Sequence, residues 1–286
     1  MESRKKCEET EKVYGDQLLQ WAYGSKLGGH LLSFLSRPEL SRLYGWIQSS
    51  TFSRFKINRF IKDFHIPMED YEEKSFSSFN DFFIRKFREG KRNFSSTPSD
   101  FCAPAEGRYL AFDRITPTQT FPVKGTYLKA SDLLGDNIKA QPFMEGPLVI
   151  ARLCPVDYHR FHFPDSGEVL ERYTISGELH SVNPIALKTK EDIFIKNERQ
   201  VTILKTKNFG KIAFIEVGAM MVGKIVQTYS GIQFFKGQEK GYFLFGGSTV
   251  VILGEPGRLR MSSDILEKSK NNQECFIKLG EVIATT

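Results

Sequence analysis

The four residues Gly246-Gly247-Ser248-Thr249 place a hydroxyl nucleophile directly after two glycines and directly before a β-branched run. This order suits an attack by Ser248 on the peptide bond before it, because glycines lack Cβ and let the turn adopt strained backbone angles. Such an attack cuts the chain between Gly247 and Ser248 and can leave a carbonyl cofactor at the new N-terminus. Turns of this composition also commonly do no more than connect two strands. The tetrapeptide alone leaves both interpretations open.

A second group of reactive side chains comes from His159 and His162, two of the five histidines, which lie three positions apart. Their pKa values are ordinarily near neutral, so either ring is suited to act as a general base or acid. Zinc generally needs three or four ligands, and the other histidines and cysteines are scattered without ligand spacing. We therefore expect no metal site. The alternative is a pair of core histidines satisfied by hydrogen bonds.

Together, these two stretches resemble the phosphatidylserine decarboxylase family of self-processing pyruvoyl enzymes. The family's Gly-Ser-Thr motif matches residues 247–249, and its Asp-Tyr-His-Arg-x-His segment matches residues 157–162. The resemblance runs in order from about Phe76 to the C-terminus. Five further segments are similar to the family: residues 79–87, 103–108, 123–125, 197–199 and 236–239.

The resemblance implies a triad for the first step. His162 would take the proton from Ser248, and Glu106 would orient the imidazole, as the acid does in a hydrolase. The family usually has aspartate where this chain has Glu106. Glutamate has the same charge and one more methylene, so it can still accept a hydrogen bond from the ring. Asp157 is the alternative acid.

The resemblance also implies the products and the second step. Cleavage would give a β chain of residues 1–247 and an α chain of residues 248–286, which stay associated. Ser248 would become the pyruvoyl cofactor and form a Schiff base with the amine of phosphatidylserine, acting as an electron sink while CO₂ leaves. The product would be phosphatidylethanolamine. His159 is the candidate for this step, as a proton donor or as a group near the substrate carboxylate.

The overall charge is informative about partners. The net charge is +6, and the pI is near 9.0, which favours an anionic partner. On charge alone, nucleic acid and anionic lipid are equal candidates; the resemblance selects the membrane surface and no nucleic acid. No apolar run approaches the ~20 residues that span a bilayer, and the N-terminus lacks the apolar region of a signal peptide. We expect a peripheral protein on the cytoplasmic side of the cell membrane, with homo-oligomerisation left open.

The pattern along the chain predicts an α+β fold. Residues 1–75 are expected to form a helical, membrane-associating region, and residues 76–286 a mostly-β decarboxylase domain. Near the N-terminus, apolar residues from Leu27 to Leu35 follow helical spacing, and Pro38 is expected to end that helix. A clearer amphipathic helix follows, with apolar Ile57, Phe60, Ile61 and Phe64 among basic residues. Its apolar face suits either the lipid headgroup region or packing against the main domain.

A short helix is expected over residues 79–87. Glycine and proline then separate short strands, and the polar residues 268–274 predict a loop. We expect strands over residues 107–112, 148–152, 168–175, 200–206, 211–217, 242–245 and 249–253.

Three other functions remain open on the sequence. A Ser/His/acid hydrolase is disfavoured, because Ser248 is not in a Gly-x-Ser-x-Gly elbow and opens a strand rather than a helix. A non-catalytic, basic, amphipathic lipid- or nucleic-acid-binding protein would depend on the helix around Arg54 to Lys62 alone. A pyruvoyl decarboxylase of a soluble amino acid is disfavoured by that same amphipathic segment.

Overall fold

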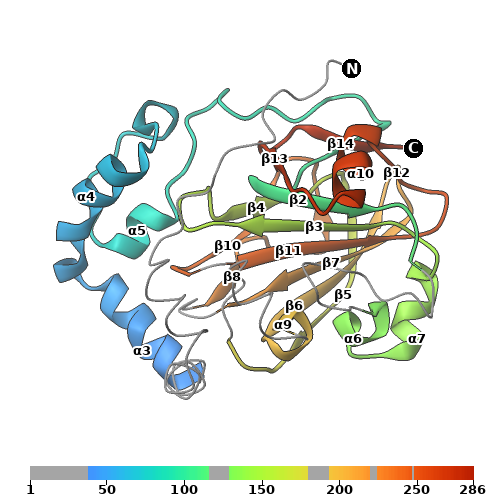
Figure 1. Cartoon of the computed structure of the whole chain (residues 1–286), viewed down its shortest axis with the longest axis horizontal. Helices are drawn as coiled ribbons and strands as arrows, with labels where there is room; N and C mark the ends of the chain where they lie inside the picture. Colours follow the sequence, from blue (N-terminus) through green and yellow to red (C-terminus); the bar gives the residue numbers. More distant parts are fainter. Residues whose placement is uncertain (1–37, 116–128, 180–192, 220–223, 247) are drawn as a thin grey trace.

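The computed structural model describes residues 38–115, 129–179, 193–219, 224–246 and 248–286. Its N-terminal helices gather at one end of a large sheet, and the later helices lie elsewhere around that sheet (Figure 1). The N-terminal helices are α3 (Pro38–Ser49), η1 (Thr51–Arg54), α4 (Phe55–Phe64), η2 (Met68–Asp70) and α5 (Phe79–Phe83). The later helices are α6 (Ala130–Leu134), α7 (Asn137–Ala140), η3 (Gln141–Phe143), α9 (Ile193–Lys196) and α10 (Ser263–Lys270).

The strands form three antiparallel sheets within the described residues. The eight-stranded sheet has the order β13-β2-β3-β11-β7-β6-β5-β9, and the two smaller sheets have the orders β4-β10-β8 and β1-β14-β12. The first strands are β1 (Asp100–Cys102), β2 (Gly107–Phe112), β3 (Leu148–Leu153), β4 (Arg160–His162), β5 (Gly167–Ile175), β6 (Arg199–Thr206) and β7 (Lys211–Val217). The remaining strands are β8 (Ile225–Gln227), β9 (Gln233–Phe234), β10 (Glu239–Phe243), β11 (Ser248–Gly254), β12 (Arg260–Met261), β13 (Cys275–Ile277) and β14 (Val282–Thr285).

The predicted α+β fold, with helices followed by a mostly-β region, is confirmed. Strand β11 shows why the apolar pattern was informative: every residue of it is buried. A continuous apolar run is typical of a strand covered on both faces, and β11 lies between β3 and β7. Six of the expected strands are found within one residue of their bounds, and the seventh, β10, begins and ends earlier. The predicted boundary near residue 76 stays a prediction.

The helices differ from the expectation in three places. Pro38 begins α3, which agrees with the preference of proline for the first helical position; the helix expected before it lies outside the described residues. The helix expected over residues 79–87 ends at Phe83. The loop expected over residues 268–274 begins later, because α10 continues to Lys270 with Ile265 and Ser269 buried.

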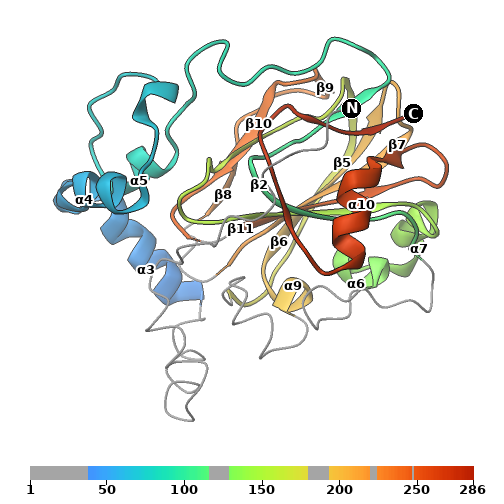
Figure 2. The same ribbon diagram turned by 45° about the horizontal axis from the view of Figure 1, so that its top comes forward.

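The apolar face of α4 packs inside the protein. Ile57 and Phe60 are buried in a cluster that includes Phe79 and Phe82 of α5, and the Phe60 ring meets the Phe79 ring edge-on at 5.3 Å. Of the two uses expected for this face, the structure shows packing against the protein. Figure 2 shows the same grouping of α3, α4 and α5 beside the end of the sheet.

Candidate active site

Ser248 begins β11 and is completely buried. Its backbone pairs with Leu153 of β3, so the sheet fixes its position. Its Oγ atom has no hydrogen-bond partner within the described residues. A buried hydroxyl without a partner is costly, and a catalytic role is one of the reasons for which native proteins keep such a group.

The chain bends at Phe245 and Gly246, just ahead of Ser248. Gly246 has φ of 143°, a conformation that side chains with Cβ rarely adopt. Just before it, the backbone N–H of Phe245 donates to Oδ1 of Asn80 at 2.8 Å. Gly247 lies outside the described residues. The chain is therefore held on both sides of residues 246 and 247: by the hydrogen bond of Phe245 before them and by strand β11 after them.

His159 carries an unpartnered ring nitrogen beside this turn. Its Nδ1–H donates to the carbonyl oxygen of Asp157 at 3.0 Å, which leaves Nε2 as the basic atom, and Nε2 is buried without a partner. The ring of Phe83 packs against the imidazole in a tilted arrangement, with a centroid distance of 3.9 Å. Burial is the main cause that lowers the pKa of His159 to about 3, and the backbone of Gly246 acts in the opposite direction. His159 is thus neutral, with Nε2 as its unprotonated nitrogen.

His162 has both ring nitrogens engaged. Nδ1–H donates to the carbonyl of Gly237 at 2.9 Å, and Nε2 lies 3.4 Å from the hydroxyl of Tyr158. Burial lowers its pKa. Among the described contacts, none joins its ring to Ser248, so the pair expected from the resemblance is not formed in this arrangement.

Glu106 is held by an arginine rather than by a histidine. Its carboxylate accepts from Nε of Arg92 at 2.5 Å and from Nη2 at 2.9 Å, and it also accepts from the N–H of Leu279. The described contacts therefore do not bring Glu106 to His162. The longer glutamate side chain places its carboxylate against the guanidinium of Arg92.

Asp157, the alternative acid, is also engaged. Its Oδ2 accepts from the N–H of Cys154 at 2.7 Å and from Nη1 of Arg108 at 3.0 Å. Burial raises its pKa to about 6, although the charge of Arg108 opposes that shift. Asp157 serves His159 through its backbone, because its carbonyl fixes the tautomer of the ring.

A model of the phosphatidylserine decarboxylase family matches residues 79–285. The chain belongs to this family. Its similarity to curated relatives extends over nearly the whole length. The phosphatidylserine decarboxylase proenzyme of Clostridium kluyveri is 40% identical over 96% of this chain and 94% of the relative. Those of Clostridium botulinum (strain 657) and Clostridium beijerinckii are each 39% identical, over 99% and 98% of this chain and 97% and 96% of the relatives.

Two residues of the family match touch the site although sequence reasoning gave them no role. Asn80 holds Phe245, as described above. Arg85 donates from Nη2 to the carbonyl of Asp157 at 3.2 Å, so one oxygen accepts from both Arg85 and His159. Nε and Nη1 of Arg85 are buried without a partner in the described chain. The only available signal was their place in the segment 79–87, which showed family likeness without a role.

Within the described residues, no group of three or more His, Cys, Asp or Glu side chains is placed to hold a metal ion. His30, His180 and Cys7 lie outside that part of the chain.

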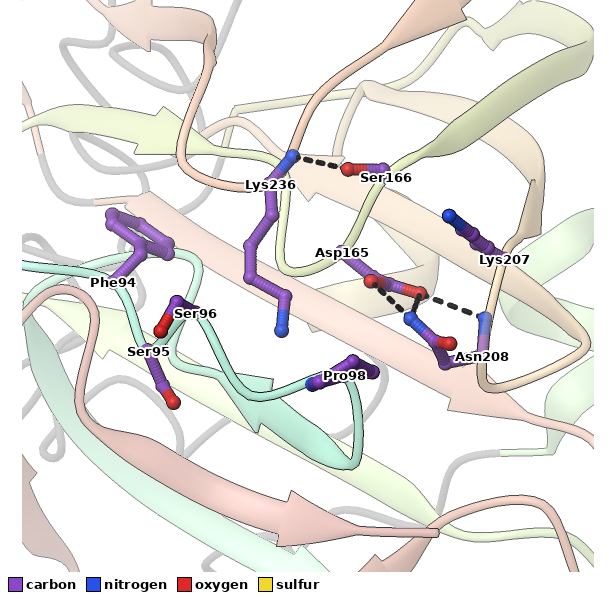
Figure 3. A pocket seen from close by; sticks show the side chains of 9 residues that line it. All are labelled: Phe94, Ser95, Ser96, Pro98, Asp165, Ser166, Lys207, Asn208 and Lys236. Carbon is purple, nitrogen blue, oxygen red and sulfur yellow. Dashed lines mark hydrogen bonds between the residues drawn. The ribbon is translucent and has the colours of Figure 1, made fainter.

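A cavity of about 420 Å³ lies close to the residues that contact His162 (Figure 3). Lys236 extends across it, with its ammonium group bonded to the carbonyls of Thr97 and Asp100, and Asp165 holds Asn208. Phe94, on its wall, also lies 5.9 Å from the His162 ring. Neither Ser248 nor His159 is among its lining residues, so this cavity is separate from the reactive turn.

Proposed function

We propose that this chain is a phosphatidylserine decarboxylase that cuts itself before Ser248 and converts phosphatidylserine to phosphatidylethanolamine and CO₂. Family membership over nearly the full length supports the reaction, and the curated relatives are named as proenzymes. The observation that carries the proposal is the buried, unpartnered Oγ of Ser248 directly after a glycine turn. A hydroxyl in that position is suited to react with its own backbone.

In the first stage, Oγ of Ser248 attacks the carbonyl of Gly247 and the acyl group moves from nitrogen to oxygen. Elimination of the resulting ester leaves a carboxylate on Gly247 and dehydroalanine at 248. Water then replaces the nitrogen of that residue with oxygen, and ammonia leaves. The products are the chains 1–247 and 248–286. We propose that they stay associated, because the second chain contributes strands to the middle and edge of the sheets.

The residues around position 248 fit a pyruvoyl group. The pyruvoyl ketone supplies an electrophile for the substrate amine and an acceptor for the electrons released with CO₂. His159 presents a neutral, unpartnered Nε2 beside the turn, which fits a group that moves a proton at the substrate in the second stage. Burial of Ser248 and His159 keeps water from competing for that proton.

For the first proton transfer, the resemblance assigns the base to His162 and its orienting acid to Glu106. Both side chains are engaged elsewhere in the described arrangement, so this assignment needs a rearrangement of the His162 ring. His159 is the alternative base, because its Nε2 is not engaged elsewhere, but no described contact joins that ring to Ser248 either. If His162 is the first base, a variant without its imidazole should stay uncut; if His159 is the first base, the His159 variant should stay uncut instead.

We further propose that the protein works as a peripheral protein on an anionic membrane at the cytoplasmic side. Within the described residues, no helix is long and apolar enough to cross a bilayer. Large apolar side chains are nevertheless exposed on α3, η1 and α4, next to basic residues: Trp46 is 71% exposed, Phe52 85% and Phe55 77%. This surface is suited to the headgroup layer that holds the lipid substrate.

Intact-mass analysis of the purified protein tests the proposed cleavage. Wild type should give two chains that part between residues 247 and 248, with the shorter chain lighter than a serine terminus requires, and Ser248→Ala should stay whole. A carbonyl reagent such as hydroxylamine should label only the shorter wild-type chain. A whole, unlabelled wild-type chain would rule the proposal out.

The histidine roles are tested by His159→Asn and His162→Asn in the same measurement. The asparagine amide keeps a donor near the position of Nδ1 and removes the basic nitrogen. A His159 role confined to the second stage predicts a cut but inactive protein, measured as loss of CO₂ release from phosphatidylserine. If His159→Asn is uncut while His162→Asn is cut, the first proton goes to His159 instead.

A further inference from the structure

The side chain of Asn80 joins three separate segments of the chain. Its Oδ1 accepts from the N–H of Phe245 at 2.8 Å. Its Nδ2 donates to the carbonyl of Gly45 at 3.1 Å and to Oγ of Ser49 at 2.9 Å. Asn80 is buried, at 3% exposure. One carboxamide thus connects α5, α3 and the residue that precedes the reactive turn.

The orientation of this amide is determined by its partners. Phe245 offers an N–H and needs an acceptor, whereas the carbonyl of Gly45 can only accept. A flipped amide would set N–H against N–H and carbonyl against carbonyl. Since a buried polar group that loses its partner costs about 1–3 kcal/mol, the native orientation is strongly favoured.

Phe245 is held by its ring as well as by its N–H. The ring lies 5.0 Å from the ring of Phe79 and 5.0 Å from that of Phe83, both on α5. Tyr44 of α3 packs against it at 5.9 Å. The position of Phe245 is therefore set by the same two helices that Asn80 connects.

The chain between Phe245 and Ser248 is short. Ser248 is fixed by its pairing with Leu153, and Thr249 pairs with Val217 on the other side of β11. Only residues 246 and 247 separate the two anchored positions. With so short a connection, a displacement of Phe245 would alter the turn before Ser248, and the rate of attack depends strongly on how the reacting groups are placed.

We propose that Asn80 is a positioning residue for self-cleavage, which holds Phe245 so that the turn presents the carbonyl of residue 247 to Oγ of Ser248. The same amide ties the turn to α3, the helix that exposes Trp46. This inference rests on the proposed self-cleavage. It assigns to the segment 79–87 a function in the geometry of the turn rather than in packing alone.

The test is the cleavage rate of newly made full-length chain in cell-free translation, followed by intact mass over time. Asn80→Ala removes all three bonds and should slow cleavage roughly tenfold or more, the equivalent of about 1.4 kcal/mol or more in the barrier. Asn80→Asp keeps an acceptor for Phe245 but sets its other oxygen against the carbonyl of Gly45, so its rate should lie between those of Asn80→Ala and wild type. Ser49→Ala removes one partner on α3 alone and should cleave at close to the wild-type rate.

Asp81→Ala is the matched control on the same helix. Asp81 bonds to Lys74 and Ser77 at the surface, away from the turn. Melting temperatures are compared in the uncleavable Ser248→Ala background, where all variants are single chains. If Asn80 positions the turn, Asn80→Ala should slow cleavage far more than Asp81→Ala does, even where the two substitutions lower the melting temperature equally.

Two results would overturn the inference: wild-type cleavage by Asn80→Ala, or slowing in Asn80→Ala and Asp81→Ala that simply follows their melting temperatures. Failure of the proposed function is a different result, since wild type itself would then remain whole. In that case the role of Asn80 in cleavage falls with it.

Discussion

At the scale of single residues, His159 shows how burial selects a protonation state. The ring is enclosed between Phe83 and the backbone of residue 157. Water is excluded, so the charged form is disfavoured, and the nearby charge of Arg85 lowers the pKa further. A neutral base at this position is available over the whole neutral range.

The lowered pKa of His159 predicts how the free energy of unfolding depends on pH. The pKa of His159 is about 3 in the fold and ordinarily about 6.5 in an unfolded chain. Between these values the unfolded state binds more protons, so the free energy of unfolding falls as the pH drops from 6.5 towards 3. We expect urea unfolding of the Ser248→Ala precursor at pH 7, 5.5 and 4 to show this fall.

The control is Ser248→Ala/His159→Asn, which retains the donor and cannot titrate. The pKa of Asp157, raised to about 6, acts in the reverse direction, because the folded state binds more protons between its ordinary value near 3.9 and 6. The control should therefore lose clearly less stability on acidification than the precursor. Equal loss in both chains would contradict the buried, neutral state of His159.

Glu106 provides a second test at residue scale. Because its carboxylate is bonded to Arg92, Glu106→Gln should lower the free energy of unfolding by about 2 kcal/mol, since among the described carboxylates Arg92 then keeps only its longer contact with Asp70. Urea unfolding in the Ser248→Ala background measures this. Replacing both partners, as Glu106→Gln/Arg92→Gln, should restore much of the loss. Cleavage lost with unchanged stability in Glu106→Gln would instead support the triad role expected from the resemblance.

Asn80, Arg85 and Glu106 also show where sequence reasoning ended. The order of motifs brought Ser248 and the two histidines into one hypothesis, because residue types and spacing carry chemistry. Which carboxylate meets which base depends on side-chain directions of segments far apart in sequence. Asn80 and Arg85 act through backbone carbonyls and N–H groups, which leave no pattern in the sequence.

At the scale of elements, the long strands were predictable, whereas most of the short strands and short helices were not. Apolar alternation and buried runs identified β2, β3, β5, β6, β7 and β11, because each is long and flanked by turn residues. Helices α6 and α7 have five and four residues, too few for a helical period to emerge. The amphipathic pattern identified α4, but such a pattern cannot say what covers its apolar face.

The exposed apolar residues of α3, η1 and α4 give a prediction for membrane binding. Trp46→Ser/Phe52→Ser/Phe55→Ser should lower the affinity for vesicles with anionic lipid roughly tenfold or more, because these rings lose their burial in the acyl boundary. Vesicle co-sedimentation measures this. A matched control is Ile138→Ser, since Ile138 is 76% exposed on α7 at the other end of the sheet (Figure 1). Equal binding by wild type and the triple variant would reject this surface as the membrane contact.

At the scale of the whole molecule, a buried ion pair joins the small and large sheets. Nζ of Lys240, on β10, bonds to Oε1 of Glu216 on β7 at 2.5 Å, to Thr202 on β6 at 3.0 Å and to Gln227 on β8 at 2.9 Å. Lys240 and Glu216 are fully buried. All three ammonium hydrogens have acceptors, so the charge fixes how β10, the strand before the reactive turn, lies on the core.

Removing one partner of this pair should be costly. We expect Lys240→Met to lower the free energy of unfolding by about 3–5 kcal/mol, because it leaves a buried carboxylate without its cation. Lys240→Met/Glu216→Leu should lose much less, since no charge remains buried. Urea unfolding of these variants and of Glu216→Leu, all in the Ser248→Ala background, gives the interaction free energy between the two side chains. Additive losses would mean that the two charges do not interact as the geometry indicates.

The position of β11 has a consequence for the lifetime of the mature protein. Residues 248–286 supply the middle of the large sheet through β11, its edge through β13, and two strands of a smaller sheet through β12 and β14. Under the proposed cleavage, this interleaving arises while the chain is still continuous. Once cut and unfolded, two chains would have to meet in solution and pair these strands anew. Synthesis would then be the only efficient route to the active protein, and its persistence would be set by its rate of unfolding rather than by an equilibrium.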